Sequence, residues 1–238
     1  KAKKNNLIFR PHFKTHQSLE IGNWYREFGV DKITVSSIRM AEYFVSDGWS
    51  DITVAFPVNV LEIERINSLA EKITLNLVVT SQEAVTILNE KLKSKVNFFI
   101  KIDTGTHRTG IDPNNTNEIN SILSESIEND KLIFKGFLAH SGHTYKTGSV
   151  EEIKKIHNEE LKIMNELKTE YIKDYPEIIC SVGDTPSCSL LDNFEGMDEI
   201  RPGNFIFYDL QQWKIGSCSL DKIAVAMACP VVSKNDER

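Results

Sequence analysis

The sequence has 238 residues, of which 40% are hydrophobic and 26% charged, as in an ordinary globular protein of one large or two small domains. Its net charge of −6 argues against general nucleic-acid binding, and no apolar run approaches the roughly 18 residues that cross a bilayer. The basic start lacks the apolar core of a signal peptide, so we expect a cytoplasmic protein without membrane or nucleic-acid partners. The cysteines are scattered without a C-x-x-C pair and indicate reduced thiols: Cys180, Cys188, Cys218 and Cys229.

Strand patterns alternate with helical patterns along the chain. The predicted strands cover residues 7–12, 32–36, 51–56, 74–79, 97–103, 133–140, 178–182 and 205–208. The predicted helices cover residues 18–28, 38–49, 60–69, 83–92, 118–127 and 150–173, and a shorter helix follows Pro186. This alternation predicts a parallel (β/α)8 barrel of the TIM type, which typically takes about 250 residues. An open doubly wound sheet is the alternative, although no glycine fingerprint of a dinucleotide fold follows the first strand.

Apolar residues at helical spacing mark the faces that we expect to be buried. Helix 18–28 would bury Leu19, Trp24 and Phe28, and helix 60–69 would bury Leu61, Ile66 and Leu69. The strand-like run at residues 222–232 has nothing after it to pair with, so we expect the chain to be a fragment of a longer protein.

The first strand is followed by the basic stretch Arg10-Pro-His-Phe-Lys-Thr-His16. At strand period, Arg10, His12, Lys14 and His16 share one face, opposite an apolar face of Leu7, Phe9, Pro11 and Phe13. Four neighbouring basic groups need an anion or a covalent partner, unless this is an edge strand that faces water. Nearby cations and partial burial lower the pKa of a lysine, and a neutral Lys14 amine could form a Schiff base with a carbonyl.

Two further strand ends carry unusual polar residues. The predicted fifth strand places Lys101 and Asp103 inward before a glycine-rich turn and Arg108, and a salt bridge between the first two would compensate their burial. The sixth strand ends in His140-Ser-Gly-His143-Thr-Tyr145, where the histidines could line a pocket or bind a metal. Tyr145 could transfer a proton or simply pack.

The last two strand ends suggest an anion site. Gly183 and the hydroxyl residues after it precede a helix start, where free backbone amides attract anions, although Thr185 before Pro186 could equally be an N-cap. Gly203 and Asn204 form the next candidate loop, and barrels commonly bind phosphate between the loops after strands seven and eight. A reactive lysine opposite a phosphate site suggests pyridoxal phosphate, which needs an amine, an anion site and a partner for its ring nitrogen.

Five ordered motifs carry a resemblance to a known family. They are residues 10–16, 101–110 (KIDTGTHRTG), 139–145 (AHSGHTY), 181–186 (SVGDTP) and 199–212 (EIRPGNFIFYDLQQ). The chain resembles the D-serine dehydratases and D-threonine aldolases, which are alanine-racemase-like pyridoxal phosphate enzymes, and the last motif is most similar to eukaryotic-type D-serine dehydratases. The resemblance implies a barrel that carries the cofactor, here residues 1–221, and a second, mostly β, domain after it, whose first strand would be residues 222–238.

The resemblance also implies roles for single residues. Lys14 would form the Schiff base, Arg108 would lie near the cofactor ring and Tyr145 over the substrate. The phosphate would be held by Gly183, Thr185, Gly203 and Asn204, and Arg201 occupies the position where alanine racemases place an arginine against the ring nitrogen. We also count His12 and His140 among the cofactor-binding residues and His143 among the catalytic ones.

The implied reaction is an elimination on a D-amino acid. Lys14 would remove the Cα proton, and the β-hydroxyl would leave with help from zinc, giving ammonia and a 2-oxo acid (pyruvate from D-serine). The family binds zinc through a histidine and a cysteine of the second domain, so the metal ligands are expected outside this chain, which by itself could be inactive. A homodimer is expected for the full-length protein. The alternatives are retro-aldol cleavage to glycine and an aldehyde, and a barrel that binds pyridoxal phosphate without catalysis.

Overall fold

The chain folds into a barrel of eight parallel strands. A computed structural model describes residues 1–234. The strands are β1 (Ile8–Phe9), β2 (Ile33–Val35), β3 (Asp51–Pro57), β4 (Thr74–Val79), β5 (Val96–Lys101), β6 (Leu132–Leu138), β7 (Ile179–Val182) and β8 (Glu199–Ile200). Their order is β1-β8-β7-β6-β5-β4-β3-β2, and each neighbouring pair is parallel. Just beyond β1, Phe13 N donates to Thr34 O of β2 (2.8 Å) and Thr34 N to Pro11 O (2.9 Å), which closes the ring. The predicted barrel is confirmed.

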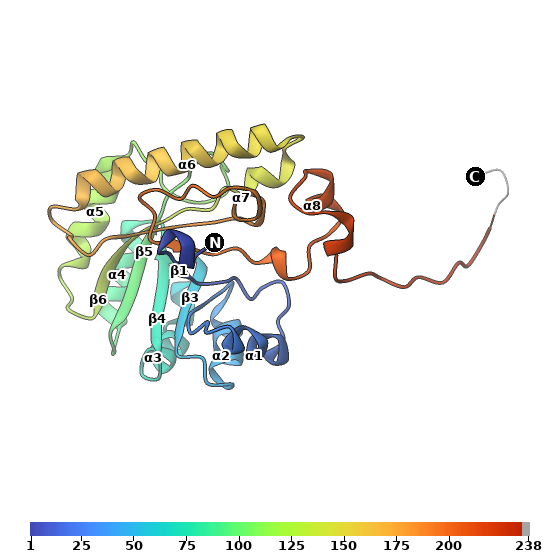
Figure 1. Ribbon diagram of the computed structural model, residues 1–238. Helices are drawn as coiled ribbons and strands as arrows, with labels where there is room; N and C mark the ends of the chain where they lie inside the picture. The colour runs from blue at the N-terminus through green and yellow to red at the C-terminus, as the bar shows by residue number, and fades with distance from the viewer. Residues whose placement is uncertain (235–238) are drawn as a thin grey trace.

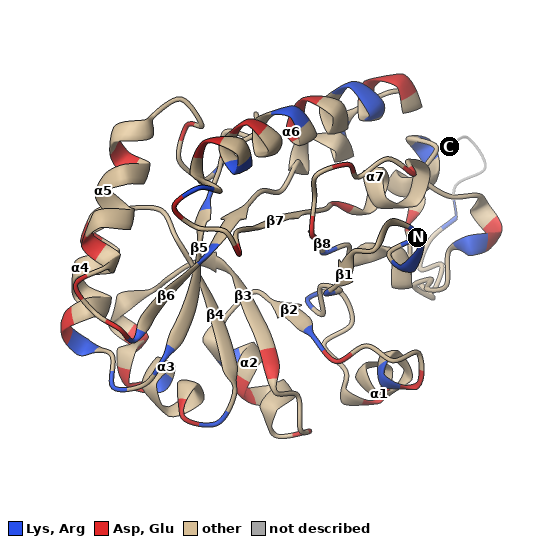
Figure 2. Cartoon of the chain, turned by 60° about the vertical axis from the view of Figure 1, so that its left-hand side comes forward, with Lys and Arg blue, Asp and Glu red and all other residues tan. Residues whose placement is uncertain are grey.

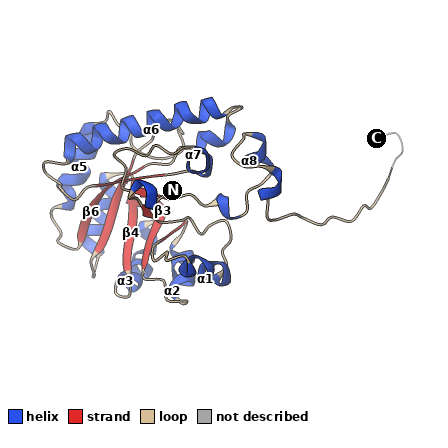
Figure 3. Ribbon diagram, in the orientation of Figure 1, coloured by secondary structure: helices blue, strands red, loops and turns tan. Residues whose placement is uncertain are grey.

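Helices cover the outside of this barrel (Figures 1 and 3). They are α1 (Leu19–Glu27), α2 (Ile38–Val45), α3 (Ile63–Ala70), α4 (Gln82–Lys91), α5 (Thr116–Ser126), α6 (Val150–Tyr171), α7 (Thr185–Leu190) and α8 (Leu210–Lys214). Short 3-10 segments are η1 (Lys3–Asn5), η2 (Val60–Glu62), η3 (Gly142–Lys146), η4 (Asn204–Ile206) and η5 (Leu220–Lys222). Most charged positions lie on the outer helices and connecting loops, which leaves apolar surface for the core (Figure 2).

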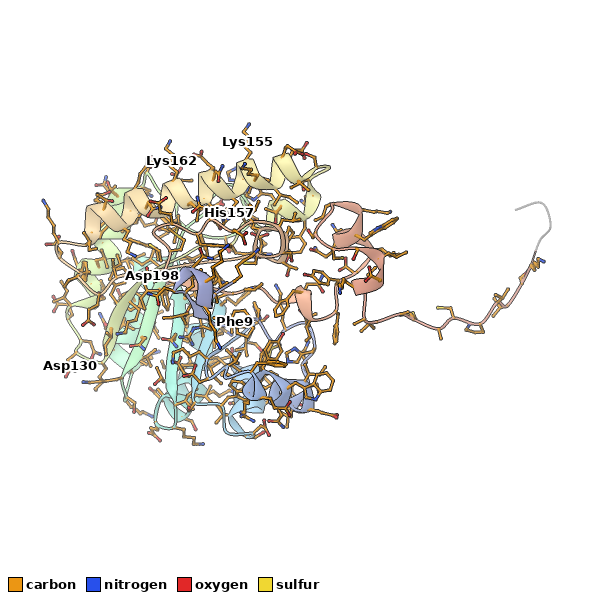
Figure 4. All side chains as sticks on the ribbon, in the orientation of Figure 1. Phe9, Asp130, Lys155, His157, Lys162 and Asp198 are labelled. Carbon is orange, nitrogen blue, oxygen red and sulfur yellow. The ribbon has the colours of Figure 1, made fainter. Side chains whose placement is uncertain are left out.

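Helix starts follow local capping chemistry. The hydroxyls of Ser18, Ser37, Ser81 and Ser149 accept hydrogen bonds from backbone amides in the first turns of α1, α2, α4 and α6. On α6, Lys155 and Lys162 project away from the body, whereas His157 faces it and is buried (Figure 4). These four helices thus begin after a capping serine and turn an apolar face to the strands.

The predicted buried face of α1 was partly wrong. Phe28 is 80% exposed and Trp24 49% exposed, and the helix instead buries Gly22 and Tyr25. Gly22 packs against the Phe13 ring, and a Cβ added at this glycine would lie 3.4 Å from a ring carbon. Leu61, also predicted as buried, is 90% exposed because it lies in η2, whose 3-10 geometry does not follow the α-helical period.

The prediction of the eighth strand at 205–208 was also wrong. Residues 204–206 form η4, and β8 is the two-residue segment Glu199–Ile200, which pairs with Ser181 and Val182 of β7. The apolar run at 205–207 has the pattern of a buried strand, which explains the wrong prediction. The actual strand was not recognised because it contains Glu199, whose buried carboxylate has partners only at distant positions of the sequence. The correction places the loop of Gly203 and Asn204 after strand eight, at the same end as the other strand-end loops.

The last described residues leave the barrel. Residues 223–234 belong to no strand and extend away from the body (Figure 1). Val225, Met227, Val231 and Val232 are exposed there. The assignment of 222–238 to a second β domain stays a prediction, and residues 235–238 lie outside the described residues. None of the described helices is long and apolar enough to span a membrane.

Candidate active site

A pocket lies at the carboxyl ends of the strands, where barrels of this kind carry their working residues. A small cavity of about 50 Å³ is lined by His12, Lys14, Ala55, Lys101, Arg108, Leu138, His140, Tyr145, Gly183, Asp184, Arg201, Gly203 and Asn204. All of the predicted site residues except His143 and Thr185 are in this lining. Residues from at least four strand ends therefore meet in one place, although their segments are far apart in sequence.

Lys14 lies at the mouth of this pocket and remains accessible to solvent. It belongs to a turn that follows the closing bridge between His12 and Thr34. The preceding residue, Phe13, is fully buried, with Tyr25, Phe44 and Trp49 rings about it at centroid distances of 5.0–5.1 Å. This aromatic cluster fixes the backbone from which the Lys14 side chain enters the pocket.

The local environment lowers the pKa of the Lys14 amine. Partial burial is the largest cause, and the positive charges of Arg108 and Arg201 add to it. A lower pKa increases the fraction of neutral amine at neutral pH, which is the nucleophilic form. This agrees with the direction expected from the sequence, but the cations responsible come from other strand ends rather than from the first strand itself.

The predicted face of four basic residues is wrong. Arg10 is buried in the barrel, where it pairs with Glu199 and Asp51. His16 packs against Phe13 and Tyr25, with ring centroids 4.4 and 5.7 Å away. Strand alternation fails here because β1 ends at Phe9 and residues 13–16 form a turn. Of the four, His12 and Lys14 line the pocket.

The pocket gathers positive charge. Four basic residues line it: Lys14, Lys101, Arg108 and Arg201. In the described part of the chain, none of these four forms an ion pair. Burial and the charges of Arg201 and Arg108 lower the pKa of Lys101 to about 8. Cationic groups without carboxylate partners make the pocket suited to an anionic ligand.

The predicted salt bridge between Lys101 and Asp103 is wrong. Asp103 Oδ1 accepts hydrogen bonds from Gly105 N and His107 N, both at 3.0 Å, and Oδ2 lies 3.2 Å from His107 Nδ1. The chain leaves β5 at Lys101, so the alternation that would place both side chains inward ends between them. Sequence reasoning therefore missed Lys101 as a pocket residue, although its inward position on β5 was the signal that could have found it.

His12 and His140 are buried neutral groups in the pocket wall. Burial, followed by the charge of Lys14, lowers the pKa of His12 well below its usual value, and burial lowers the pKa of His140 to about 3. His140 Nδ1 lies 3.0 Å from Gly183 O, so this nitrogen carries the proton and Nε2 keeps its lone pair. Neutral imidazoles at these positions add no further repulsion among the cations.

His143 lies behind the pocket wall. Thr106 Oγ1 donates its proton to His140 O (2.9 Å), so His143 Nδ1, 3.1 Å away, donates to Thr106. His140 and His143 thus have different partners, and within residues 1–234 no group of three histidines, cysteines or acids could hold a metal ion. A metal centre on this histidine pair is not supported, and the catalytic role of His143 stays a prediction.

Thr185 is not in the pocket lining, but its hydrogen bonds link the loops after strands seven and eight. Its backbone N donates to Tyr145 Oη (3.1 Å), and its Oγ1 accepts from Asn204 N (2.9 Å). The Tyr145 hydroxyl is therefore held on this loop, and burial raises the pKa of Tyr145 to about 12. The N-cap of α7 is Asp184, whose Oδ1 accepts from Ser187 N (2.9 Å), and not Thr185 as the capping alternative supposed.

Two glycines bring backbone close to backbone around the pocket. A Cβ on Gly203 would lie 2.8 Å from His12 O, and one on Gly183 would lie 2.7 Å from Arg201 N. Gly183 also has φ +130°, a conformation that L side chains rarely adopt. These loops can approach one another, and any ligand between them, only because both positions lack a side chain.

Known proteins are similar to this chain in sequence and in fold. Residues 9–211 match the family described as the alanine racemase N-terminal domain. The chain is 32% identical to the D-serine dehydratase of Dictyostelium discoideum over 96% of its own length and 63% of that protein. A solved structure of D-threo-3-hydroxyaspartate dehydratase from Delftia sp. HT23 superposes with a TM-score of 0.86 at 26% identity, covering 94% of this chain and 60% of that one.

A second solved structure shows the same fold at lower sequence identity. The D-threonine aldolase of Filomicrobium marinum superposes with a TM-score of 0.81 at 20% identity, over 90% of this chain and 59% of the other. The chain thus spans about three fifths of the length of these relatives. With a match over most of its residues and the barrel in place, the chain belongs to the alanine racemase N-terminal domain family.

Proposed function

We propose that this barrel binds pyridoxal phosphate and serves a lyase that acts on small D-amino acids, with dehydration of D-serine as its activity. One observation carries the proposal: a lysine with a lowered pKa stands in a pocket whose other cations have no carboxylate partners. The similarity to dehydratases named for D-serine and D-threo-3-hydroxyaspartate supports the class of substrate.

The residues present fit this cofactor. Its phosphate and phenolate are anionic, and Lys101, Arg108 and Arg201 offer positive charge around the pocket. Gly183 and Gly203 line the pocket in the loops after strands seven and eight, where barrels of this type commonly bind phosphate. Because Thr185 N and Asn204 N already donate hydrogen bonds within the protein, we assign the phosphate chiefly to the backbone at Gly183 and Gly203.

Lys14 has two tasks in this proposal. Pyridoxal phosphate, when bound, supplies an aldehyde for an amine and a ring that withdraws electrons from the substrate's Cα. Lys14 Nζ is the amine that would hold the cofactor, and as a neutral amine it could also accept the Cα proton of the substrate. The lowered pKa of Lys14 favours the neutral amine that both tasks require.

The roles of the other residues follow from their places. Arg108 and Arg201 orient the anionic cofactor and stabilise the negative charge that develops when the Cα proton leaves. Tyr145 lies in the pocket wall with its hydroxyl anchored by Thr185, so it can orient the substrate and exclude water. His12 and His140 remain neutral and limit the net charge around the ligand.

Three further proposals rest on the resemblance described above. Ligands of a second domain, which we place after residue 221, would hold a zinc ion, and that ion would supply Lewis-acid chemistry toward the β-hydroxyl. The protein acts as a homodimer, and it is cytoplasmic. Metal analysis of the purified protein and its mass by light scattering test the first two.

The activity test compares products from two substrates. The protein is supplied with pyridoxal phosphate and zinc ions, and ammonia and glycine are measured after addition of D-serine or D-threonine. We expect ammonia and pyruvate from D-serine, with activity lost in Lys14→Ala and kept in Lys154→Ala, which removes an exposed lysine of α6. Glycine in place of ammonia would indicate the aldolase reaction, and cofactor binding without either product would indicate a non-catalytic barrel.

A further inference from the structure

A line of charged side chains crosses the inside of the barrel below the pocket. Arg10 Nη1 donates to Asp51 Oδ1 (2.6 Å), and Arg10 Nε donates to Glu199 Oε2 (2.5 Å). Burial acts to lower the pKa of Arg10, but the two carboxylates outweigh it and raise that pKa. Glu199 is fully buried, and its hydrogen bond from Arg10 fixes the position of its carboxylate.

Ser181 stands between this carboxylate and the pocket. Its Oγ lies 2.6 Å from Glu199 Oε1 and 2.7 Å from Arg201 Nε. The Arg201 Nε–H can only donate, so Ser181 accepts from Arg201 and directs its one proton to Glu199 Oε1. The orientation of this hydroxyl is therefore fixed by its two neighbours.

The hydroxyl also keeps two opposite charges apart. Among the described residues, Arg201 forms no ion pair with Glu199, although both contact the same oxygen. The Arg201 guanidinium instead donates to the backbone carbonyls of Ala139 and Ser181 and lines the pocket. Without the hydroxyl, a buried guanidinium and a buried carboxylate would attract each other strongly enough to meet.

We propose that Ser181, held by Glu199, is a positioning residue that keeps the Arg201 guanidinium directed toward the pocket instead of toward Glu199. Its effect on the cofactor rests on the proposed function, whereas its effect on Arg201 does not. The charge of Arg201 reaches much of the pocket, since it contributes to the lowered pKa of His12, Lys14 and Lys101. A shift of this one group toward Glu199 would make the pocket less positive.

The test removes the hydroxyl and follows the cofactor. In Ser181→Ala, we expect pyridoxal phosphate to bind about tenfold more weakly, because the hydrogen bond that holds the Arg201 guanidinium toward the pocket is lost. We also expect a higher pH midpoint for the absorbance change of the Lys14–cofactor linkage, because less positive charge then opposes its protonation. Thr53→Val is the matched control: it removes another fully buried strand hydroxyl, one without a hydrogen-bond partner in the structure, and should change neither quantity.

A second readout needs no cofactor. A crystal structure of cofactor-free Ser181→Ala should show Arg201 in direct contact with Glu199, and an unmoved guanidinium would overturn the proposal. If Ser181→Ala does not fold, Ser181→Cys preserves most of the volume with a weaker donor and acceptor, and should show the same changes to a smaller extent.

The two proposals fail in different ways. An unsubstituted protein that forms no linkage at Lys14 contradicts the proposed function, and the crystallographic readout still decides the role of Ser181. If the linkage forms normally but Ser181→Ala has the affinity and pH midpoint of the unsubstituted protein, the positioning role is wrong while the proposed function stands.

Discussion

At the scale of single residues, the pocket distinguishes between two lysines. Lys14 is accessible at the mouth, whereas Lys101 is 5% exposed and has its pKa lowered to about 8, chiefly by burial. A low pKa alone would favour Lys101 as the nucleophile, but a nucleophile must also be reachable. Accessibility therefore favours Lys14 over Lys101 for the proposed covalent role.

Gly203→Ala should weaken cofactor binding by about tenfold or more. The added Cβ would lie 2.8 Å from His12 O, so the segment that carries Lys14 must shift, at an overpacking cost of about 1–3 kcal/mol. Fluorescence titration with pyridoxal phosphate measures the change. Gly148→Ala is the control, because a Cβ there meets nothing within 4 Å; equal affinities for both variants would contradict the tight contact described here.

His16 should make the protein sensitive to acid. Burial lowers the pKa of His16 from 6.5 to about 4, and neither ring nitrogen has a hydrogen-bond partner in the structure. Between pH 6.5 and 4 the unfolded chain binds a proton that the folded chain does not, so stability falls as the pH falls. In His16→Phe, the loss of unfolding free energy between pH 7 and pH 5 should be smaller in urea titrations; an unchanged loss would exclude His16 as a cause.

At the scale of elements, the predictions succeeded where local pattern decides and failed where distant residues decide. The strand at Thr74–Val79 and the helix from Val150 were predicted closely because apolar runs and periodicity are local. The eighth strand was missed because the burial of Glu199 depends on distant partners, above all Arg10, which is 189 positions away. The basic face was misread for a related reason: the end of β1 at Phe9 is set by pairing with β8.

The packing of α1 and α2 around Phe13 should dominate the stability of the Lys14 segment. Phe13 is fully buried, so Phe13→Ala should lower the free energy of unfolding by about 3–5 kcal/mol through the cavity it leaves. Phe28→Ala at the C-cap of α1, where the ring is 80% exposed, should change it by no more than about 0.5 kcal/mol. Denaturant unfolding compares the two, and similar losses would contradict the observed orientation of α1.

At the scale of the whole molecule, the barrel unites residues from distant segments in one pocket. The ends of β1, β5, β7 and β8 contribute Lys14, Lys101, Gly183 and Arg201, so composition and spacing alone could nominate these residues but could not show which would meet. The motifs that resemble a family linked most of them in advance. The roles of Ser181 and Glu199 carry no such local signal and emerged only from the hydrogen bonds.

Because ligand contacts would join these segments, pyridoxal phosphate should stabilise the entire barrel. At a concentration of about 100 times Kd, a ligand that binds only the folded state adds about 2.7 kcal/mol, which raises Tm. Thermal unfolding with and without the cofactor measures this. Inorganic phosphate at equal concentration is the control for simple anion binding, and an equal rise in Tm with phosphate would argue against a site for the whole cofactor.

The covalent role of Lys14 is tested most directly by borohydride reduction of the protein after addition of pyridoxal phosphate, followed by peptide mapping. We predict one stably labelled peptide with the pyridoxyl group on Lys14, and no such peptide in Lys14→Ala. A label on Lys101, or labels spread over exposed lysines with Lys14 unmodified, would contradict the account.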